Sequence, residues 1–247
     1  PAALERAITP RTKAIVAVHL FGLAAPMNQI MAIAAKHNLA VIEDAACAIG
    51  TTYQGVPVGT IGTIGCFSFH PRKVVTTGEG GAVTTQSDEL ATAIRSLRNH
   101  GATGLPSSDI EPHGPWTMAT FDRVGFNLRL SDIQSAVGVA QMTKLPHLLA
   151  DRKASAQRYF DALDGLNDIG LPSKDPGHTY QSFVIRVHEG GRARRNAIMN
   201  ELARQGVQTR PGTHAVHRLG HYRNKYAHDA GDFPHAAAAE DLTITLP

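Results

Sequence analysis

The sequence predicts an α/β fold, with a large domain built on a mixed, mostly parallel sheet and a smaller α+β domain at the C-terminal end. Short apolar strands alternate with amphipathic helices along the first part of the chain, which is the pattern of a layered α/β domain. Beyond this part, strand, helix and strand segments follow one another in a smaller group. We therefore place the domains at 1–164 and 165–247.

The first strands and helix form a predicted βαβ unit. AIVAVHLFG (14–22) and LAVIED (39–44) are apolar runs of the kind found in buried strands. Between them, Pro26 opens MNQIMAIAAKHN, whose apolar residues recur at helical spacing. Two strands joined by one helix over roughly thirty residues are expected to run parallel.

The rest of the chain is assigned by the same criteria, with Ser87 as the N-cap of the helix over 87–101. The expected elements are a hairpin or loop over 52–62, strands over 64–69 and 81–85, a helix over 87–101, a long loop over 102–126, two helices over 131–146 and 148–163, a strand over 181–187, a helix over 192–206 and a strand over 242–247.

Composition excludes several classes of protein. Hydrophobic residues make up 43% of the 247 residues, so the chain can bury a substantial core. The net charge of +3 is small and no basic run stands out, so nucleic-acid binding is not indicated.

Two cysteines form no disulfide framework, and no apolar run is long enough to span a bilayer, so we expect a cytoplasmic protein. Neither end has the polar character of a natural terminus, which suggests a piece of a longer protein.

Asp44 stands at the C-terminal end of a predicted parallel strand, where ligands of open α/β sheets bind. The residues that follow, AACAIG, are small and mostly apolar, so a carboxylate here would be poorly solvated and would need a cationic partner. On spacing alone, an acid that caps the next segment or pairs with a surface arginine is the commoner arrangement.

The stretch CFSFHPRKVVTTGEGG (66–81) places Lys73 between an apolar strand and a glycine-rich turn. A lysine amine in a partly desolvated site loses proton affinity and becomes a usable nucleophile or base. Ser68 and free N–H groups are suited to hold a phosphate. A lone lysine in a loop is more often a solvated surface charge.

The three residues together indicate one cofactor class. A phosphorylated aldehyde cofactor needs a lysine for its Schiff base, an acid for its pyridinium nitrogen and donors for its phosphate. Lys73, Asp44 and Ser68 supply these groups on neighbouring strand ends of one predicted sheet.

The segment VIEDAACAIGTTYQGVPVGTIGTIGCFSFHPRKVVTTGEGGAVTT strongly resembles the DegT-type sugar-nucleotide aminotransferases. The resemblance continues through RSLRNHGA, VGFNLRLSDIQSAVGVAQMTKL, RYFDAL and GVQTRPGTHAVHRLGHYRNKY to LTITLP, so it covers essentially the whole chain. It implies a pyridoxal-phosphate (PLP) enzyme of the aspartate aminotransferase fold, apparently shortened at both ends.

The resemblance assigns roles to four positions. Lys73 matches the lysine that carries PLP and then shuttles a proton on the substrate. Asp44 matches the aspartate that pairs with the pyridine nitrogen, and Ser68 matches a phosphate-binding serine. Asn127 in GFNLR matches an asparagine that reaches the phosphate from the other subunit, which implies a homodimer with a shared active site.

Two departures from the family pattern matter. Cys47 occupies a position that is often glutamine, where the amide touches the phenolic oxygen of the cofactor. A thiol is a weaker donor, so that contact is expected to be weaker here. The family's N-terminal part, which gives a Gly-Thr phosphate turn and a stacking aromatic, has no counterpart in this sequence.

His214, His217 and His221 recur at spacings of three and four, which one continuous helix would bring together as metal ligands. Gly220 falls inside this run, so we expect no such helix and no metal. In the resembling family this region lies near the sugar-nucleotide site, which implies substrate-binding roles for Arg210 and His214.

The sequence thus predicts an aminotransferase that moves an amino group from an amino acid, L-glutamate by resemblance, to a nucleotide-linked keto sugar. A PLP-dependent sugar dehydratase is one alternative, but the relatives with that activity replace the lysine with histidine. A non-catalytic binding or regulatory protein on the same fold is the other alternative. A lysine at position 73 argues against the dehydratase, and an intact Lys73 and Asp44 pair favours the aminotransferase over the binding or regulatory protein.

Overall fold

The structure, a computed structural model, describes residues 1–104 and 114–247. The chain forms two compact units, one made of Pro1–Leu20 with Ala24–His147 and the other of Phe21–Leu23 with Leu148–Pro247. The division falls inside a helix, upstream of the boundary near residue 165 that the sequence favours.

The helices and strands of the first unit are α1 (Ala2–Ala7), β1 (Ala14–Val18), α2 (Met27–Lys36), β2 (Ala40–Asp44), β3 (Thr52–Tyr53), β4 (Val56–Pro57), β5 (Ile64–Ser68), β6 (Gly81–Thr84), α3 (Asp88–Leu97), β7 (Ala102–Gly104) and β8 (Thr120–Phe121). Helix α4 (Asp132–Leu163) belongs in part to each unit, and the short 3-10 helix η1 (Leu20–Gly22) does as well. The second unit adds β9 (Ile169–Gly170), β10 (Phe183–Val187), α5 (Gly191–Arg204), β11 (Arg210–Pro211), η2 (Val216–Arg218), α6 (Gly220–Tyr226), α7 (Pro234–Leu242) and β12 (Thr243–Leu246).

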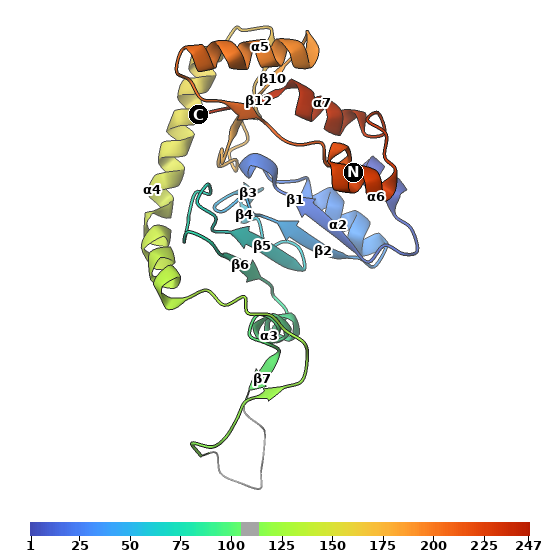
Figure 1. The fold of residues 1–247 in the computed structure, drawn as a ribbon, viewed down its shortest axis with the longest axis vertical. Helices are drawn as coiled ribbons and strands as arrows, with labels where there is room; N and C mark the ends of the chain where they lie inside the picture. Colours follow the sequence, from blue (N-terminus) through green and yellow to red (C-terminus); the bar gives the residue numbers. More distant parts are fainter. Residues whose placement is uncertain (105–113) are drawn as a thin grey trace. The chain divides into compact units, whose positions relative to one another are not determined.

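The sheet of the first unit has the order β1-β2-β5-β6 (Figure 1). Strands β1, β2 and β5 are parallel, and β6 pairs with β5 in the antiparallel sense. The predicted βαβ unit and the mixed, mostly parallel sheet are therefore confirmed. Parallel neighbours place their carboxyl ends at one edge of the sheet, so the residues that end β2 and β5 lie at the same edge.

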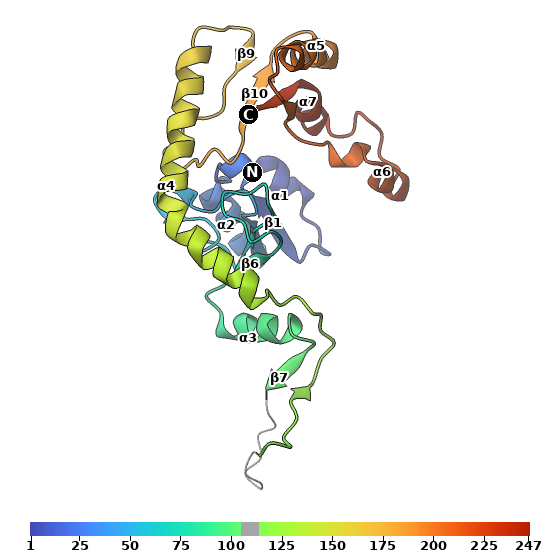
Figure 2. The ribbon, with the colours of Figure 1, turned by 60° about the vertical axis from the view of Figure 1, so that its left-hand side comes forward.

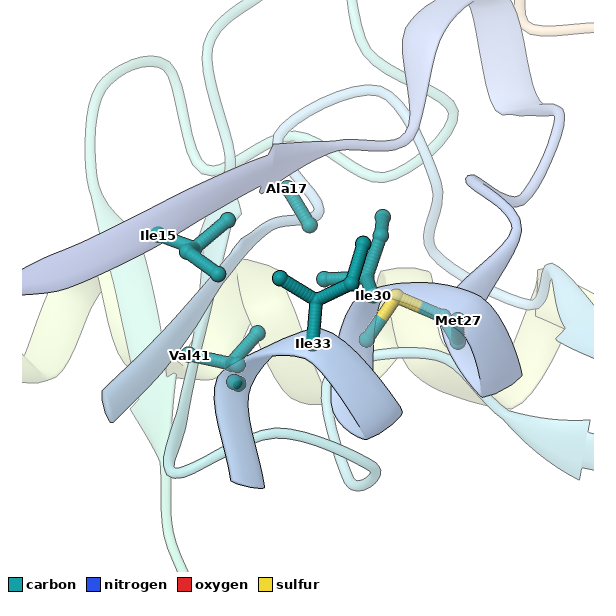
Figure 3. Packing of buried hydrophobic residues seen from close by; sticks show 7 residues of the cluster. Ile15, Ala17, Met27, Ile30, Ile33 and Val41 are labelled. Carbon is teal, nitrogen blue, oxygen red and sulfur yellow. The ribbon is translucent and has the colours of Figure 1, made fainter. Parts of the chain in front are cut away.

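Helix α2 covers one face of this sheet because both elements present an apolar side at their natural period. Ile15 and Ala17 on β1 share a face with Val41 on β2, as the register requires. Met27 and Ile33 of α2 pack against this face (Figure 3). Burying one such side chain contributes about 1.5–3 kcal/mol, so this cluster stabilises the packing of α2 on the sheet.

The opposite face of the same strands is more open. Val16 and Val18 alternate with the buried residues of β1 and are 60% and 48% exposed. Their register partners on β2 are Ile42 and Asp44, so the site acid lies on this open face. Parallel sheets are usually covered on both faces. In the part of the chain that the structure describes, α2 covers one face of this sheet, and the face with Val16 and Val18 is more open.

Helices α3 and α4 test two further expectations. Ser87 caps α3, because its Oγ accepts a hydrogen bond from the Leu90 amide at 3.2 Å, as predicted. The expected break between two helices at Pro146 is wrong, because α4 runs through this proline as one helix of 32 residues (Figure 2). A proline removes one helical hydrogen bond and crowds the preceding turn, and the helix on both sides of Pro146 absorbs this local defect.

The expected loop over 102–126 is partly wrong as well. Its ends pair as the antiparallel strands β7 and β8, and Thr103 donates a side-chain hydrogen bond to Asp122 across the pair. Residues 105–113 lie outside the described residues. No helix in the two described ranges, α4 included, is both long and apolar enough to cross a membrane.

The second unit is a smaller α+β layer. Its antiparallel sheet has the order β11-β12-β10-β9. Phe160 of α4 meets Phe183 of β10 edge to face, with ring centroids 5.2 Å apart, inside a buried cluster that also contains Val187 and Ile244. Edge-to-face aromatic pairs of this kind add about 0.5–1.5 kcal/mol beyond the area that they bury.

His178 helps to hold the segment Phe21–Leu23 in the second unit. The backbone amide of Thr179 donates to the Gly22 carbonyl at 3.1 Å, and Nδ1 of His178 accepts the Tyr180 amide at 3.0 Å. Burial lowers the pKa of His178 to about 4, although its hydrogen bond to Gly22 and the charge of Asp175 oppose this shift. The imidazole is therefore held neutral.

We predict that acidification destabilises the chain through His178. Its folded-state pKa is below the unfolded value near 6.5, so its contribution is fully present above pH 6.5 and is lost as the pH falls toward 4. The free energy of unfolding in urea should fall by on the order of 2 kcal/mol over this range. His178→Asn keeps an acceptor for the Tyr180 amide and should flatten this dependence.

The matched control is His235→Asn, at an exposed histidine of α7. This variant should keep the pH dependence of the parent. An equal loss of stability on acidification in the parent and in His178→Asn would show that His178 does not carry it.

Candidate active site

The carboxyl edge of the sheet brings Asp44 and Ser68 onto one face. Asp44 ends β2 and is the register partner of Cys66, while Ser68 ends β5 two residues further on. Alternate residues of a strand share a face, so Asp44, Cys66 and Ser68 project to the same side. This is the side on which Val16 and Val18 are exposed.

Lys73 follows β5 in a turn whose base is closed by hydrogen bonds. The Phe69 amide donates to the Gly80 carbonyl at 2.9 Å, and the Thr77 amide donates to the Phe69 carbonyl at 3.0 Å. Val74 and Val75 are buried directly after the lysine. The backbone of Lys73 is thus fixed on both sides, while its side chain is half-buried.

The amine of Lys73 points at the turn that follows Asp44. Its Nζ lies 3.0 Å from the Sγ of Cys47. Cys47 is half-buried in the turn that opens after β2, where the Ala48 amide donates to the Ala45 carbonyl at 2.9 Å. The structure therefore brings the amine of Lys73 to the turn that follows Asp44, although Lys73 and Cys47 are 26 residues apart in the sequence.

The position of Asp44 is set by its neighbours on three sides. Its carbonyl accepts the His19 amide at 3.0 Å, and its Oδ1 accepts the Ala46 amide at 3.1 Å. The next residue, Ala45, donates its amide to the Cys66 carbonyl at 2.9 Å. Burial raises the pKa of the Cys66 thiol, and the charge of Asp44 adds to this rise, so a neutral thiol lies beside the carboxylate.

The hydroxyl of Ser68 lies at the end of β5 and takes part in a backbone hydrogen bond. Its Oγ accepts the His70 amide at 3.3 Å, and an oxygen that accepts in this way still has one proton to donate. The side chain is half-buried at the end of β5. A phosphate oxygen or a water molecule at this edge of the sheet can accept that proton.

A buried hydrogen-bonded pair beside Asp44 was missed by the sequence reasoning. Glu43 and His19 are both fully buried, and His19 Nε2 lies 3.0 Å from Glu43 Oε2. The carboxylate also accepts the amides of Gly59, Ile61 and Gly62 at 2.7, 2.8 and 2.6 Å. The signal was present in the alternation of β2, because Glu43 shares the core face with Val41 in the position of an apolar residue.

Burial and hydrogen bonding act in opposite directions on Glu43. Burial raises the pKa of this carboxyl, but the hydrogen bonds from His19 and from the three backbone amides outweigh it and hold the pKa below its ordinary value. A carboxylate that accepts several N–H groups remains ionised for this reason. Glu43 is therefore a fixed negative charge on the core side of β2, the strand that ends in Asp44.

Asn127 is exposed in the segment that leads to α4. It forms an isolated bridge with Asn99, in the segment between β8 and α4, and its side chain is exposed. Apolar residues that flank it are also exposed, with Val124 at 88% and Leu128 at 70%. Within the described chain, Asn127 is presented outward.

Arg210 and His214 lie in the second unit. Arg210 belongs to β11, where it pairs with Thr245 of β12, and its side chain is exposed. His214 is exposed next to Ala215, whose amide donates to Glu240 at 2.7 Å. His217 lies in η2 and His221 in α6, so no single helix carries the three histidines, and no group of three metal-ligating side chains forms among the described residues.

The first unit also contains a wide groove between β6, α3 and the start of α4. Its volume is about 1340 Å³, and its lining includes Arg95, Arg98 and Arg129. The lining does not include the Lys73–Cys47 contact. The groove is therefore a separate feature from the edge of the sheet that carries Asp44.

Comparison with known sequences gives one family over the whole chain. The DegT/DnrJ/EryC1/StrS aminotransferase family matches residues 1–247. GDP-perosamine synthase from Caulobacter vibrioides is 38% identical over 234 residues, which is 94% of this chain and 59% of that protein. The chain thus spans about three fifths of the length of this curated relative.

Comparison with solved structures gives the same fold. Helicobacter pylori PseC, an aminotransferase of pseudoaminic acid biosynthesis, is 28% identical with a TM-score of 0.89, over 99% of this chain and 64% of that one. The Streptococcus pneumoniae protein Spr1654 is 27% identical with a TM-score of 0.90 in its PLP form, over 100% of this chain and 66% of that one. Spr1654 has been solved in a PMP form as well.

Both comparisons agree with the mixed, mostly parallel sheet of the first unit. The family match covers the strands that carry Asp44 and Ser68, the turn that carries Lys73 and the whole second unit. The chain belongs to the DegT/DnrJ/EryC1/StrS aminotransferase family.

Proposed function

We propose that this protein is a PLP-dependent sugar aminotransferase. It would move an amino group from an amino acid, L-glutamate, to the keto group of a nucleotide-linked sugar, as a step in making amino sugars for polysaccharides or secondary metabolites. The observation that carries this proposal is the 3.0 Å contact between Lys73 Nζ and Cys47 Sγ. Cys47 lies three residues after Asp44 in the chain.

The donor set at this edge of the sheet fits PLP. A primary amine, a carboxylate and a hydroxyl with a free proton lie on neighbouring strand ends, in Lys73, Asp44 and Ser68. PLP requires an amine for its aldehyde, an acid for its ring nitrogen and donors for its phosphate. When bound, the cofactor supplies an electron sink for a carbanion formed on the substrate.

The roles of the protein groups follow from this set. Asp44, held by the amides of His19 and Ala46, would keep a proton on the ring nitrogen. The Nζ of Lys73 would take a proton from the substrate carbon and return it, as general base and then general acid. Cys47, next to that amine, would contact the cofactor more weakly than the amide usual in the family.

Phosphate binding is proposed to involve two chains. Ser68 would donate its hydroxyl proton from the same chain, and Asn127 would reach the phosphate of a second copy. The outward position of Asn127 supports this, as do the exposed side chains around it, Val124, Phe126 and Leu128. An exposed apolar patch of this kind is typical of a protein interface, so we propose a homodimer with a shared active site.

Substrate recognition is proposed for the second unit. Arg210 and His214 are exposed there and carry groups that can bind a diphosphate or sugar hydroxyls. The names of GDP-perosamine synthase and PseC support a sugar substrate. Two free cysteines, Cys47 and Cys66, are compatible with the reducing cytoplasm, which we propose as the location.

We predict that PLP becomes attached to Lys73. Reduction of the chain with borohydride in the presence of PLP should place a pyridoxyl-phosphate mass on the peptide that contains Lys73, and glutamate should change the visible absorbance of the bound cofactor. Lys73→Ala should lose the adduct and should lower turnover by about 10²–10⁴-fold, the contribution of a positioned acid–base group.

Lys36→Ala is the matched control, since Lys36 is an exposed lysine of α2 paired with Glu5. It should keep the adduct and the glutamate response of the parent. Failure of the parent chain to take up PLP would contradict the proposal and favour a binding or regulatory protein. Uptake with no response to any amino acid would contradict the transaminase reaction.

We predict that the patch around Asn127 is a dimer interface. Sedimentation equilibrium should give twice the mass of the chain, and Val124→Lys should weaken the dimer roughly 30-fold or more, the effect of about 2 kcal/mol at a central interface residue. Val56→Lys, at an exposed valine of β4, should leave the dimer intact. A parent that sediments as a monomer at all concentrations would refute the shared site.

A further inference from the structure

We propose that Glu43 and His19 are the positioning residues of Asp44. The pair would lock the end of β2 from the core side, so that the carboxylate of Asp44 is held in one place before any ligand binds. What Asp44 does rests on the proposed function, whereas how Asp44 is held rests on the contacts below.

His19 contacts both acids at the end of β2. Its backbone amide donates to the Asp44 carbonyl at 3.0 Å, and its Nε2 lies 3.0 Å from Glu43 Oε2. Its Nδ1 accepts the Ala25 amide at 3.0 Å. Because Nδ1 is an acceptor, the proton of a neutral imidazole is on Nε2, and His19 donates it to Glu43.

Glu43 connects the same strand to the loop that leads into β5. In this loop the backbone amides of Gly59, Ile61 and Gly62 all donate to the carboxylate. The loop packs closely on β5 at the first of these residues, since a Cβ at Gly59 would lie 2.4 Å from the Phe67 ring. Loss of the carboxylate charge would leave these buried donors with a weaker acceptor.

The pair acts on Asp44 from the side opposite to its ligand. Glu43 faces the core and Asp44 faces the open side of the sheet, as neighbours on a strand must. A buried charge is weak evidence for stability, because its desolvation offsets the attraction of its partners. Its value here is geometric, since it ties β1, β2 and the loop before β5 at the residue next to the site acid.

The test uses variants that separate the two nitrogens of His19. His19→Gln can place an amide nitrogen near the position of Nε2 and keep a donor for Glu43, but it has no acceptor at the position of Nδ1. His19→Asn does the reverse. Glu43→Gln keeps the shape of the side chain and removes the charge, and Glu89→Gln, at an exposed acid of α3, is the matched control.

Two measurements are made on each chain. Amide hydrogen exchange at Ala45 and Ala46, without cofactor, reports how firmly the end of β2 is held. The ¹⁵N chemical shift of PLP labelled at its ring nitrogen, added to the same chains, reports whether Asp44 keeps that nitrogen protonated. A role limited to overall stability would raise exchange throughout the chain and would leave the shift of the bound cofactor unchanged.

In Glu43→Gln and His19→Asn we expect exchange at Ala45 and Ala46 to rise about 10- to 100-fold, the effect of losing one charge-assisted hydrogen bond, and the ring nitrogen to lose its proton. His19→Gln should stay within about threefold of the parent. Parent-like exchange and shift in Glu43→Gln would overturn the proposal. If Glu43→Gln does not fold, equal behaviour of His19→Gln and His19→Asn would overturn it.

If the parent chain takes up no PLP, the proposed function fails while the exchange measurement still decides the positioning role. If PLP binds and Glu43→Gln exchanges like the parent, the positioning role fails and the proposed function stands. The two outcomes are therefore distinguishable.

Discussion

The buried carboxylate of Glu43 is the constraint on which the carboxyl edge of the sheet depends. An ionised group in the core requires donors, and Glu43 obtains them from His19 and from three amides of the loop before β5. Each donor comes from a different part of the chain than β2. Satisfying one charge therefore fixes where β1 ends, where β5 begins and how the backbone of Asp44 is placed between them.

The candidate active site is built on this edge rather than on a separate scaffold. Asp44 is part of β2, the strand that Glu43 anchors. The Nζ of Lys73 contacts Cys47 in the turn that follows β2. The turn that carries Lys73 is itself closed at its base by Phe69 and Thr77. A catalytic lysine needs a fixed backbone and a free amine, and this turn supplies a fixed backbone on both sides of a half-buried side chain.

The apolar surface of the first unit places a second constraint on the protein. Val16 and Val18 on the open face of the sheet, and Val124 and Leu128 beside Asn127, are exposed, although valine and leucine are among the residue types most often buried. The homodimer proposed above would bury the part of this surface around Asn127.

The sequence by itself determined most of the local elements, and it supplied the residues proposed to hold the cofactor. Periodicity and capping predicted β1, α2, β2 and α3, because these features depend on neighbours a few residues apart. The residues around Lys73 indicated the resemblance to the aminotransferase family. Tertiary structure alone decided that α4 continues through Pro146, that Lys73 meets Cys47, and that Glu43 is satisfied by His19. The two contacts join groups that are far apart in the sequence, so no short window of sequence contains them. The helix continues through Pro146 because the turns on both sides absorb the local cost of the proline.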